Sequence, residues 1–256
     1  MPYTAVIGDV HGCVRTLDRL VDRIESRFSD VSYISLGDIV DRGMHSIEVT
    51  KIFMELQKQD RFRMLKGNHE DMMMDYASFT MAYPENAWFA TGGKLTISSF
   101  SGHALDNQLT LKTIRNVDFL PYLEPYLDFF RSAENYFGYD YPMNKFLFSH
   151  AGLGPSGGKA GGVNEYSYRK DYLYFWSRDT DRSTRQHFGY SMVHGHTPVK
   201  KVDAQHNPRM PYVNRNKAGE LVSVNLDTGC VYGYALSSMV IDDQGHFEFL
   251  SERCMD

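Results

Sequence analysis

Short apolar runs alternate with amphipathic segments through the first 70 residues. Residues 3–7, 31–36 and 61–66 carry many β-branched and aromatic side chains and end at glycines, which predicts buried strands. Between them, apolar residues recur at helical spacing in residues 14–28 and 47–59. This order predicts strand–helix–strand units with right-handed connections and a parallel sheet.

The second half of the chain carries further short apolar runs. Residues 145–148 and 191–193 predict two more strands, each followed by a histidine and a glycine. Three closely spaced runs follow, and we expect them to form an antiparallel second sheet. These runs are residues 221–225, 231–241 and 246–250.

The segments between these halves differ in composition. A helix is expected over residues 70–81, and the aromatic-rich residues 119–145 predict helical pieces with a loop or hairpin that covers the sheet. Residues 154–162 are rich in glycine but lack the spacing of a nucleotide-binding phosphate loop, so we expect a mobile loop. Without a repeat or a long linker, residues 1–256 predict one α/β domain of two packed mixed sheets, with an aromatic-rich insertion at about 119–145.

The composition of the chain excludes some classes of binding partner and indicates where the protein works. The formal net charge of −5 gives no general reason to bind nucleic acid or an anionic membrane surface. No apolar stretch reaches the roughly 20 residues of a membrane-spanning helix, and the first residues do not resemble a signal peptide. Cys13, Cys230 and Cys254 are few and widely spaced, which predicts free thiols and a cytoplasmic protein.

Each of the first three strands ends in a polar cluster flanked by glycine. In parallel α/β sheets the carboxyl ends of the strands lie at one edge, where ligands bind. We therefore expect these clusters to converge in space, although they are far apart in the sequence. Their members are Asp9 and His11, then Asp38, Asp41 and Arg42, then Asn68 and His69.

Two later strands end in histidines, which enlarges the set of candidate metal ligands. Carboxylate, imidazole and amide groups without thiolates suit Mn²⁺, Fe²⁺ or Zn²⁺. Six ligands exceed the need of one ion with open positions and fit two ions that share one carboxylate. The six residues are Asp9, His11, Asp38, Asn68, His150 and His196.

The order of these motifs resembles one known family. Gly-Asp-Val-His-Gly at residues 8–12, Gly-Asp-Ile-Val-Asp-Arg-Gly at 37–43 and Gly-Asn-His-Glu at 67–70 match the signatures of the phosphoprotein phosphatases, a branch of the calcineurin-like metallophosphoesterases. The segments around His150 and His196 supply its two later histidines in order. Residues 227–233 are similar to a further segment of bacterial members. The resemblance implies an αββα sandwich with two sheets between helical layers.

The family pattern also implies a role for each residue. Asp9 and His11 would hold a first divalent ion, Asp38 would bridge, and the second ion would take Asn68, His150 and His196. The implied ions are Mn²⁺, with iron or zinc as alternatives. His69 would be the general acid, oriented by Asp41. Arg42 would bind the substrate phosphate with Arg178, which is assigned by similarity to a bacterial Trp-x-Arg pattern. Lys66 stands where many relatives have arginine, so its contact with phosphate stays open.

The implied activity is hydrolysis of a phosphomonoester by a metal-bridging hydroxide that attacks phosphorus directly. A serine/threonine protein phosphatase is the leading interpretation, with a phosphorylated protein or a small phosphoester as substrate. The alternative is a symmetrical bis(5'-nucleosyl)-tetraphosphatase, in which the second motif commonly has alanine at the position of Asp41. A metal-free binding scaffold is disfavoured because all six ligand positions are filled. The sequence leaves the oligomeric state open.

Overall fold

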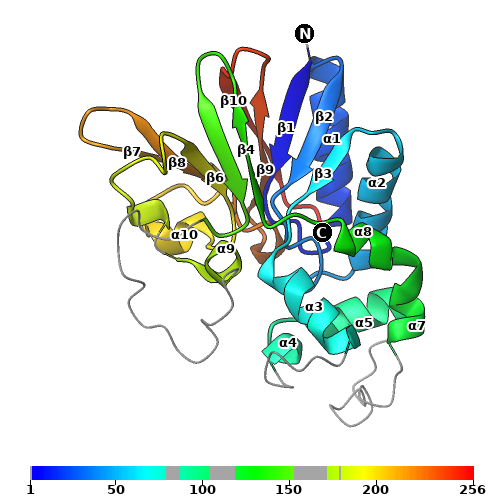
Figure 1. Ribbon diagram of the computed structural model, residues 1–256. Helices are drawn as coiled ribbons and strands as arrows, with labels where there is room; N and C mark the ends of the chain where they lie inside the picture. Colours follow the sequence, from blue (N-terminus) through cyan, green and yellow to red (C-terminus); the bar gives the residue numbers. More distant parts are fainter. Residues whose placement is uncertain (1, 79–86, 104–118, 153–171, 179) are drawn as a thin grey trace.

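The computed structural model describes residues 2–78, 87–103, 119–152, 172–178 and 180–256 (Figure 1). The loop expected at residues 154–162 lies outside these ranges. Two five-stranded sheets pack against each other, one in the order β10-β9-β1-β2-β3 and the other in the order β4-β5-β6-β8-β7. The strands are β1 (Tyr3–Ile7), β2 (Val31–Ser35), β3 (Phe62–Met64), β4 (Tyr136–Asp140), β5 (Lys145–Ser149), β6 (Ser191–His194), β7 (Tyr212–Arg215), β8 (Leu221–Asn225), β9 (Ala235–Ile241) and β10 (Phe247–Arg253).

Helices lie outside the sheets, with α1 and α2 beside the first sheet and α9 and α10 beside the second (Figure 1). The predicted mixed α/β sandwich is therefore confirmed. The α-helices are α1 (Val14–Arg27), α2 (Ser46–Lys58), α3 (Asn68–Ser78), α4 (Ala87–Ala90), α5 (Gly93–Ser101), α7 (Leu120–Leu123), α8 (Leu127–Arg131), α9 (Tyr172–Trp176) and α10 (Val199–Val202). The 3₁₀ turns are η1 (Glu124–Tyr126), η3 (Thr180–Arg182) and η4 (Cys230–Tyr232).

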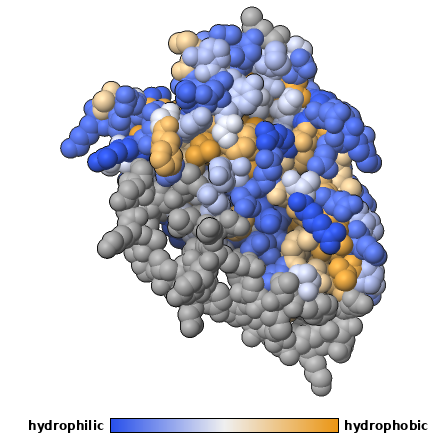
Figure 2. All heavy atoms as spheres, in the orientation of Figure 1, coloured by the Kyte–Doolittle hydropathy of each residue, from blue (hydrophilic) through white to orange (hydrophobic). Residues whose placement is uncertain are grey.

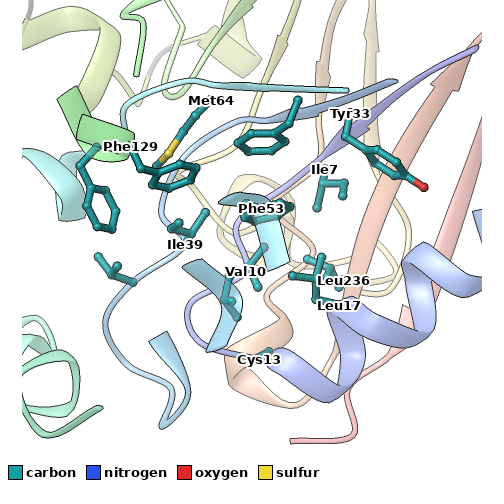
Figure 3. Packing of buried hydrophobic residues seen from close by; sticks show 14 of the residues in the cluster. Ile7, Val10, Cys13, Leu17, Tyr33, Ile39, Phe53, Met64, Phe129 and Leu236 are labelled. Atoms are coloured by element: carbon teal, nitrogen blue, oxygen red, sulfur yellow. The ribbon is translucent and has the colours of Figure 1, made fainter. Parts of the chain in front are cut away.

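Alternation along the strands builds two apolar clusters. In β1, Ala5 and Ile7 join the cluster under the helices, whereas Val6 joins the cluster between the two sheets. Leu17 of α1 and Phe53 of α2 pack into the first cluster (Figure 3). A strand buried on both faces must be apolar at every position, which explains the unbroken runs in the sequence.

The arrangement of the last three strands differs from the prediction. Strand β8 pairs in parallel with β6 in the second sheet, while β9 and β10 join the first sheet, where β9 runs antiparallel to β1. The expected antiparallel second sheet of these three strands is wrong. The turn that contains η4 carries the chain from one sheet to the other, so β8 and β9 do not pair, whereas β9 and β10 form an antiparallel pair in the first sheet.

The aromatic-rich segment contains the expected helical pieces and a hairpin. Phe119, Phe129 and Phe130 are buried in the first cluster. Strand β4 pairs with β5 and so extends the second sheet at its edge, instead of covering it as predicted. Hydrophilic and apolar residues are interspersed over the described part of the face in Figure 2. Among the described helices, none combines the length and apolar character that a bilayer crossing demands.

Candidate metal centre

The strand-end side chains meet at one edge of the sandwich, as the parallel strands predict. Asp38 Oδ2 lies 3.3 Å from Nε2 of His150 and 3.6 Å from Nε2 of His11. It belongs to two groups of donor atoms, one with His11 and His69 and the other with His150 and His196. Asp38 is therefore placed between two sets of donors. The six predicted ligands are each at most 6% exposed: Asp9, His11, Asp38, Asn68, His150 and His196.

Backbone carbonyl groups fix the direction of two of the imidazoles. Nδ1 of His11 donates to the carbonyl of Val40 at 2.8 Å, and Nδ1 of His150 donates to that of Leu36 at 2.9 Å. Both rings therefore turn Nε2 toward Asp38. Such bonds behind a ligand are the usual way to set its tautomer and orientation for a metal ion.

The second group of donors gathers around Asn68. Its Oδ1 lies 2.9 Å from Nδ1 of His196 and 3.1 Å from Nε2 of His150. The buried Nε2 of His196 has no hydrogen-bond partner among the described residues. A buried polar atom without a partner is costly, and a bound cation would satisfy it.

Electrostatics give His11, His196 and Asp38 the protonation states of metal ligands. Burial, followed by the Arg42 charge, holds the pKa of His11 well below its usual range, and burial with the His150 charge does the same for His196. Burial opposes ionisation of Asp38, but His150 and His69 hold its pKa well below the usual value. Neutral imidazoles and an ionised carboxylate are what a divalent ion binds, so these three residues fit a metal site. Burial lowers the pKa of His150, but the Asp38 carboxylate outweighs burial and raises that pKa to about 9, so a metal ion would displace a proton from His150.

The backbone at this edge is strained. Eight non-glycine residues of the described chain have positive φ, and five of them belong to the site. Each left-handed residue costs about 1–3 kcal/mol, a cost that recurs where geometry must be held for function. The five are His11, Asp38, Asp41, Arg42 and His196.

Two glycines permit the carboxylates to approach the main chain. A Cβ at Gly67 would collide with the Asp38 carboxylate, and one at Gly195 would collide with that of Asp9. The Asp9 carboxylate also accepts the backbone N–H of His196 at 3.0 Å, which ties the end of the first strand to the end of β6. These glycines are needed because side chains would occupy the places of the acidic groups.

Glu70 holds the loops together from behind. Its carboxylate accepts the backbone N–H groups of Asp38 and Ile39, each at 2.8 Å, and of Gly67 at 2.9 Å. These bonds give Glu70 a supporting role that joins the loop after β2 to the loop after β3.

A second buried pair lies beside the donor groups. Nδ1 of His69 donates to Oδ2 of Asp41 at 2.6 Å, and both side chains are fully buried. Asp41 also accepts from Nε1 of Trp88 at 2.8 Å and from the Thr96 hydroxyl at 2.5 Å. The Asp41 carboxylate is thus fixed from three directions, and it orients His69 with Nε2 toward the site.

The chain is similar to a known family along most of its length. A profile of the calcineurin-like phosphoesterases matches residues 3–223. The chain belongs to the calcineurin-like phosphoesterase family. The motif resemblance is confirmed at this level, and the donor set matches the family's two-metal site.

The relatives of this phosphoesterase are named for different activities. It is 24% identical over 255 residues to a bis(5'-nucleosyl)-tetraphosphatase PrpE [asymmetrical] of Halalkalibacterium halodurans, covering 91% of this chain and 88% of the relative. A cold-active protein-tyrosine phosphatase of a Shewanella species has the same fold, with a TM-score of 0.62 at 16% identity over 100% of this chain and 81% of that one. A Saccharomyces cerevisiae protein serine/threonine phosphatase gives 0.52 at 14% identity, with the same shares of the two chains.

The predicted phosphate-binding arginines of this phosphoesterase occupy different surroundings. Arg42 donates to Nε2 of His11 at 2.6 Å and to Nε2 of His69 at 2.8 Å. Arg178 is exposed, donates to the hydroxyl of Thr197 at 3.4 Å, and lies close enough to lower the pKa of His196. Lys66 lies 5.8 Å from the ring centre of Phe175.

Three residues of the site were not predicted. Asp227 follows β8 at the same edge, is 3% exposed, and its charge adds to burial in raising the pKa of Asp9. Its segment was noticed for its resemblance to bacterial members, which was the signal available. Trp88 and Thr96 have no surrounding motif, and only the fold brings them to Asp41.

Proposed function

We propose that this phosphoesterase is a metal-dependent serine/threonine protein phosphatase that hydrolyses phosphomonoesters. The observation that carries the proposal is the buried pair of His69 and Asp41, joined at 2.6 Å. A serine or threonine alkoxide is a poor leaving group and needs a proton as it departs, which a positioned imidazole can deliver. The nucleotide that leaves a phosphoanhydride departs as a stable anion and has less need of such an acid.

In this proposal each predicted residue keeps one task. Two Mn²⁺ ions held by Asp9, His11, Asp38, Asn68, His150 and His196 would supply water activation and charge neutralisation when bound. His69 accepts from Arg42 at Nε2 in this structure, so it must first take up a proton from solvent at Nε2 once Arg42 has turned to the phosphate. That proton then passes to the leaving oxygen, while Asp41 holds the ring through Nδ1. Arg42 and Arg178 bind the phosphoryl oxygens, Arg42 through a guanidinium fork that suits two oxygens.

The contact between Arg42 and His11 supports this division of tasks. Nε2 of His11 has one lone pair, so it cannot accept from Arg42 and hold a metal ion at the same time. With an ion bound, the Arg42 guanidinium loses that partner and is available to a substrate phosphate. Its position next to both His11 and His69 puts this charge between the ion site and the proton donor.

A second candidate function follows from the relatives. The bis(5'-nucleosyl)-tetraphosphatase relative is matched along most of both chains, which favours cleavage of a dinucleoside tetraphosphate. The symmetrical type is disfavoured because Asp41 is present, whereas that type commonly lacks it. The asymmetrical type remains the competitor, and it would produce ATP and AMP from diadenosine tetraphosphate.

A comparison of two substrates distinguishes the protein phosphatase from the dinucleoside tetraphosphatase. We expect kcat/KM with Mn²⁺ to be higher for a phosphoserine peptide than for diadenosine tetraphosphate, with release of inorganic phosphate. Higher kcat/KM for the dinucleotide, with nucleotide products separated by chromatography, would overturn the protein phosphatase proposal. The products ATP and AMP would identify the asymmetrical activity, and two ADP would identify the symmetrical one.

A further inference from the structure

Three cysteines from distant parts of the sequence meet next to the metal centre. Their sulfur atoms all lie within 4.8 Å of one another. Cys13 precedes helix α1, Cys230 begins η4, and Cys254 follows strand β10. Figure 3 shows Cys13 at the start of α1, at the margin of the first apolar cluster. The expectation of free thiols is confirmed, but their convergence was not predicted.

The spacing of the sulfur atoms suits a metal ion. An ion about 2.3 Å from three sulfurs in one plane places those sulfurs about 4 Å apart. The observed limit of 4.8 Å requires a shift of only some tenths of an ångström per side chain. A disulfide bond would have to bring two sulfurs to about 2 Å and would leave the third unused.

The donor set narrows the kind of ion. Within the described ranges, no histidine or carboxylate side chain joins the three sulfurs at this spacing. Thiolates select soft ions such as Cu(I), and structural Zn²⁺ sites are almost always completed by a fourth ligand. Three sulfurs without a fourth such group therefore favour Cu(I).

The surroundings offer access and compensating charge. Cys13 and Cys230 are at most 2% exposed, while Cys254 is half-buried. Cys13 and Cys254 line a cavity of about 310 Å³ that Arg15 and Arg42 also line. Three thiolates around one monovalent ion carry two net negative charges, and Arg15 and Arg42 bring positive charge to this cavity, which Asp256 also lines.

The cluster is held in place by the end of the chain. The Asp256 carboxylate accepts the backbone N–H groups of Arg15 at 3.0 Å and Thr16 at 3.1 Å, and the Thr16 hydroxyl accepts the N–H of Met255 at 2.9 Å. These bonds fix Cys254 against the start of α1, where Cys13 lies.

We propose that Cys13, Cys230 and Cys254 form a trithiolate site for Cu(I), separate from the two-metal centre. Binding exchanges three thiol protons for one ion, and the copper remains monovalent throughout. The site joins the segment after β1, the turn after β8 and the end of the chain, so that one ion ties three strand ends together.

The test is an anaerobic titration of the full chain with Cu(I) in competition with bicinchoninate. We expect one tightly bound Cu(I) ion per chain and three sulfur neighbours of that ion by X-ray absorption. All three thiols should stop reacting with a thiol reagent once the ion is bound. Cys254→Ser and Cys230→Ser should each weaken binding by at least about 100-fold, since loss of a group that only supports a ligand already costs roughly 10–100-fold. Met255→Ala changes a partly exposed neighbour of Cys254 and serves as the matched control, with unchanged affinity.

Three results would overturn the proposal. One is Cu(I) affinity that is unchanged in both cysteine variants, and another is a nitrogen or oxygen shell around the copper. The third is a protein that binds no Cu(I) but forms a disulfide bond between two of these cysteines when treated with peroxide. That result would make the two thiols a redox pair. Because no readout uses phosphoester hydrolysis, the result is independent of the function proposed above.

Discussion

Asp41 and His69 form a hydrogen bond of 2.6 Å in a place from which solvent is excluded. The acidic partner is itself in the left-handed conformation, with φ of 68°. Strain at Asp41 is offset by its bonds to Thr96 and Trp88. The pair is therefore a supported unit, and its members can be tested separately.

Replacing the imidazole tests the proton donor. We expect His69→Asn to lower turnover of a phosphoserine peptide by about 10²–10⁴-fold, the usual contribution of general acid catalysis. Hydrolysis of p-nitrophenyl phosphate should fall much less, because its leaving group departs without a proton. Equal losses on the two substrates would contradict the assignment.

Variants at Thr96 test whether its hydroxyl supports the pair of Asp41 and His69. It accepts the Asp41 N–H at 2.8 Å and donates to the Asp41 carboxylate at 2.5 Å. Thr96→Val leaves both groups without this partner and should lower the free energy of unfolding by about 1–3 kcal/mol, together with turnover. Thr96→Ser keeps the hydroxyl and is the matched control. Urea denaturation of both variants measures the effect, and equal stability of the two would refute it.

Metal removal tests the shared position of Asp38. Activity should disappear after chelation and return with Mn²⁺. Because Asp38 belongs to both donor groups, Asp38→Asn should weaken the binding of both ions in calorimetric titrations. Full activity of a stripped sample, or a variant that loses one ion only, would be inconsistent with this arrangement.

Glu70 predicts a dependence of stability on pH. Burial, followed by the charge of Asp38, raises the pKa of Glu70 from 4.5 to about 7. Because the folded protein holds this proton more tightly than the unfolded chain, protonated Glu70 contributes to the free energy of unfolding. The contribution is complete below the pKa of the unfolded state and is lost as the pH rises through the pKa of the folded state. In chelator-treated protein, the advantage in unfolding free energy over Glu70→Gln should therefore shrink from pH 4.5 to about pH 7. An advantage that grows over this interval would show that the backbone N–H groups donated to the carboxylate stabilise its ionised form more strongly than burial opposes it.

The sequence predicts the position of those candidate site residues that directly follow a strand. Asp9, Asp38 and Asn68 each follow a predicted parallel strand, and the shared edge of parallel strands brings them together. Glycines next to these residues mark close approaches, since a Cβ would collide with the backbone of Leu226 at Gly8, with that of Gly67 at Gly37 and with the Asp38 carboxylate at Gly67.

Other contacts depend on how distant segments pack, which no local pattern encodes. Thr96 and Trp88 reach Asp41 from short helices with no motif. The short spacing of β8, β9 and β10 along the chain predicts one shared sheet, but β9 and β10 lie in the first sheet. All seven residues of β9 are buried, as expected of a strand between a helical layer and a second sheet.

The pairing of β1 has a consequence for the order in which the protein matures. Thr4 lies between Ser32 on one side and Ile241 on the other, so one neighbour of β1 is synthesised about 200 residues before the other. A ribosome releases the Asp9 and Asp38 motifs long before the histidines of β5 and β6 and the second edge of β1 exist. The six candidate ligands therefore cannot come together on a nascent chain until β6 and His196 have emerged, whereas β9 closes the second edge of β1 only later.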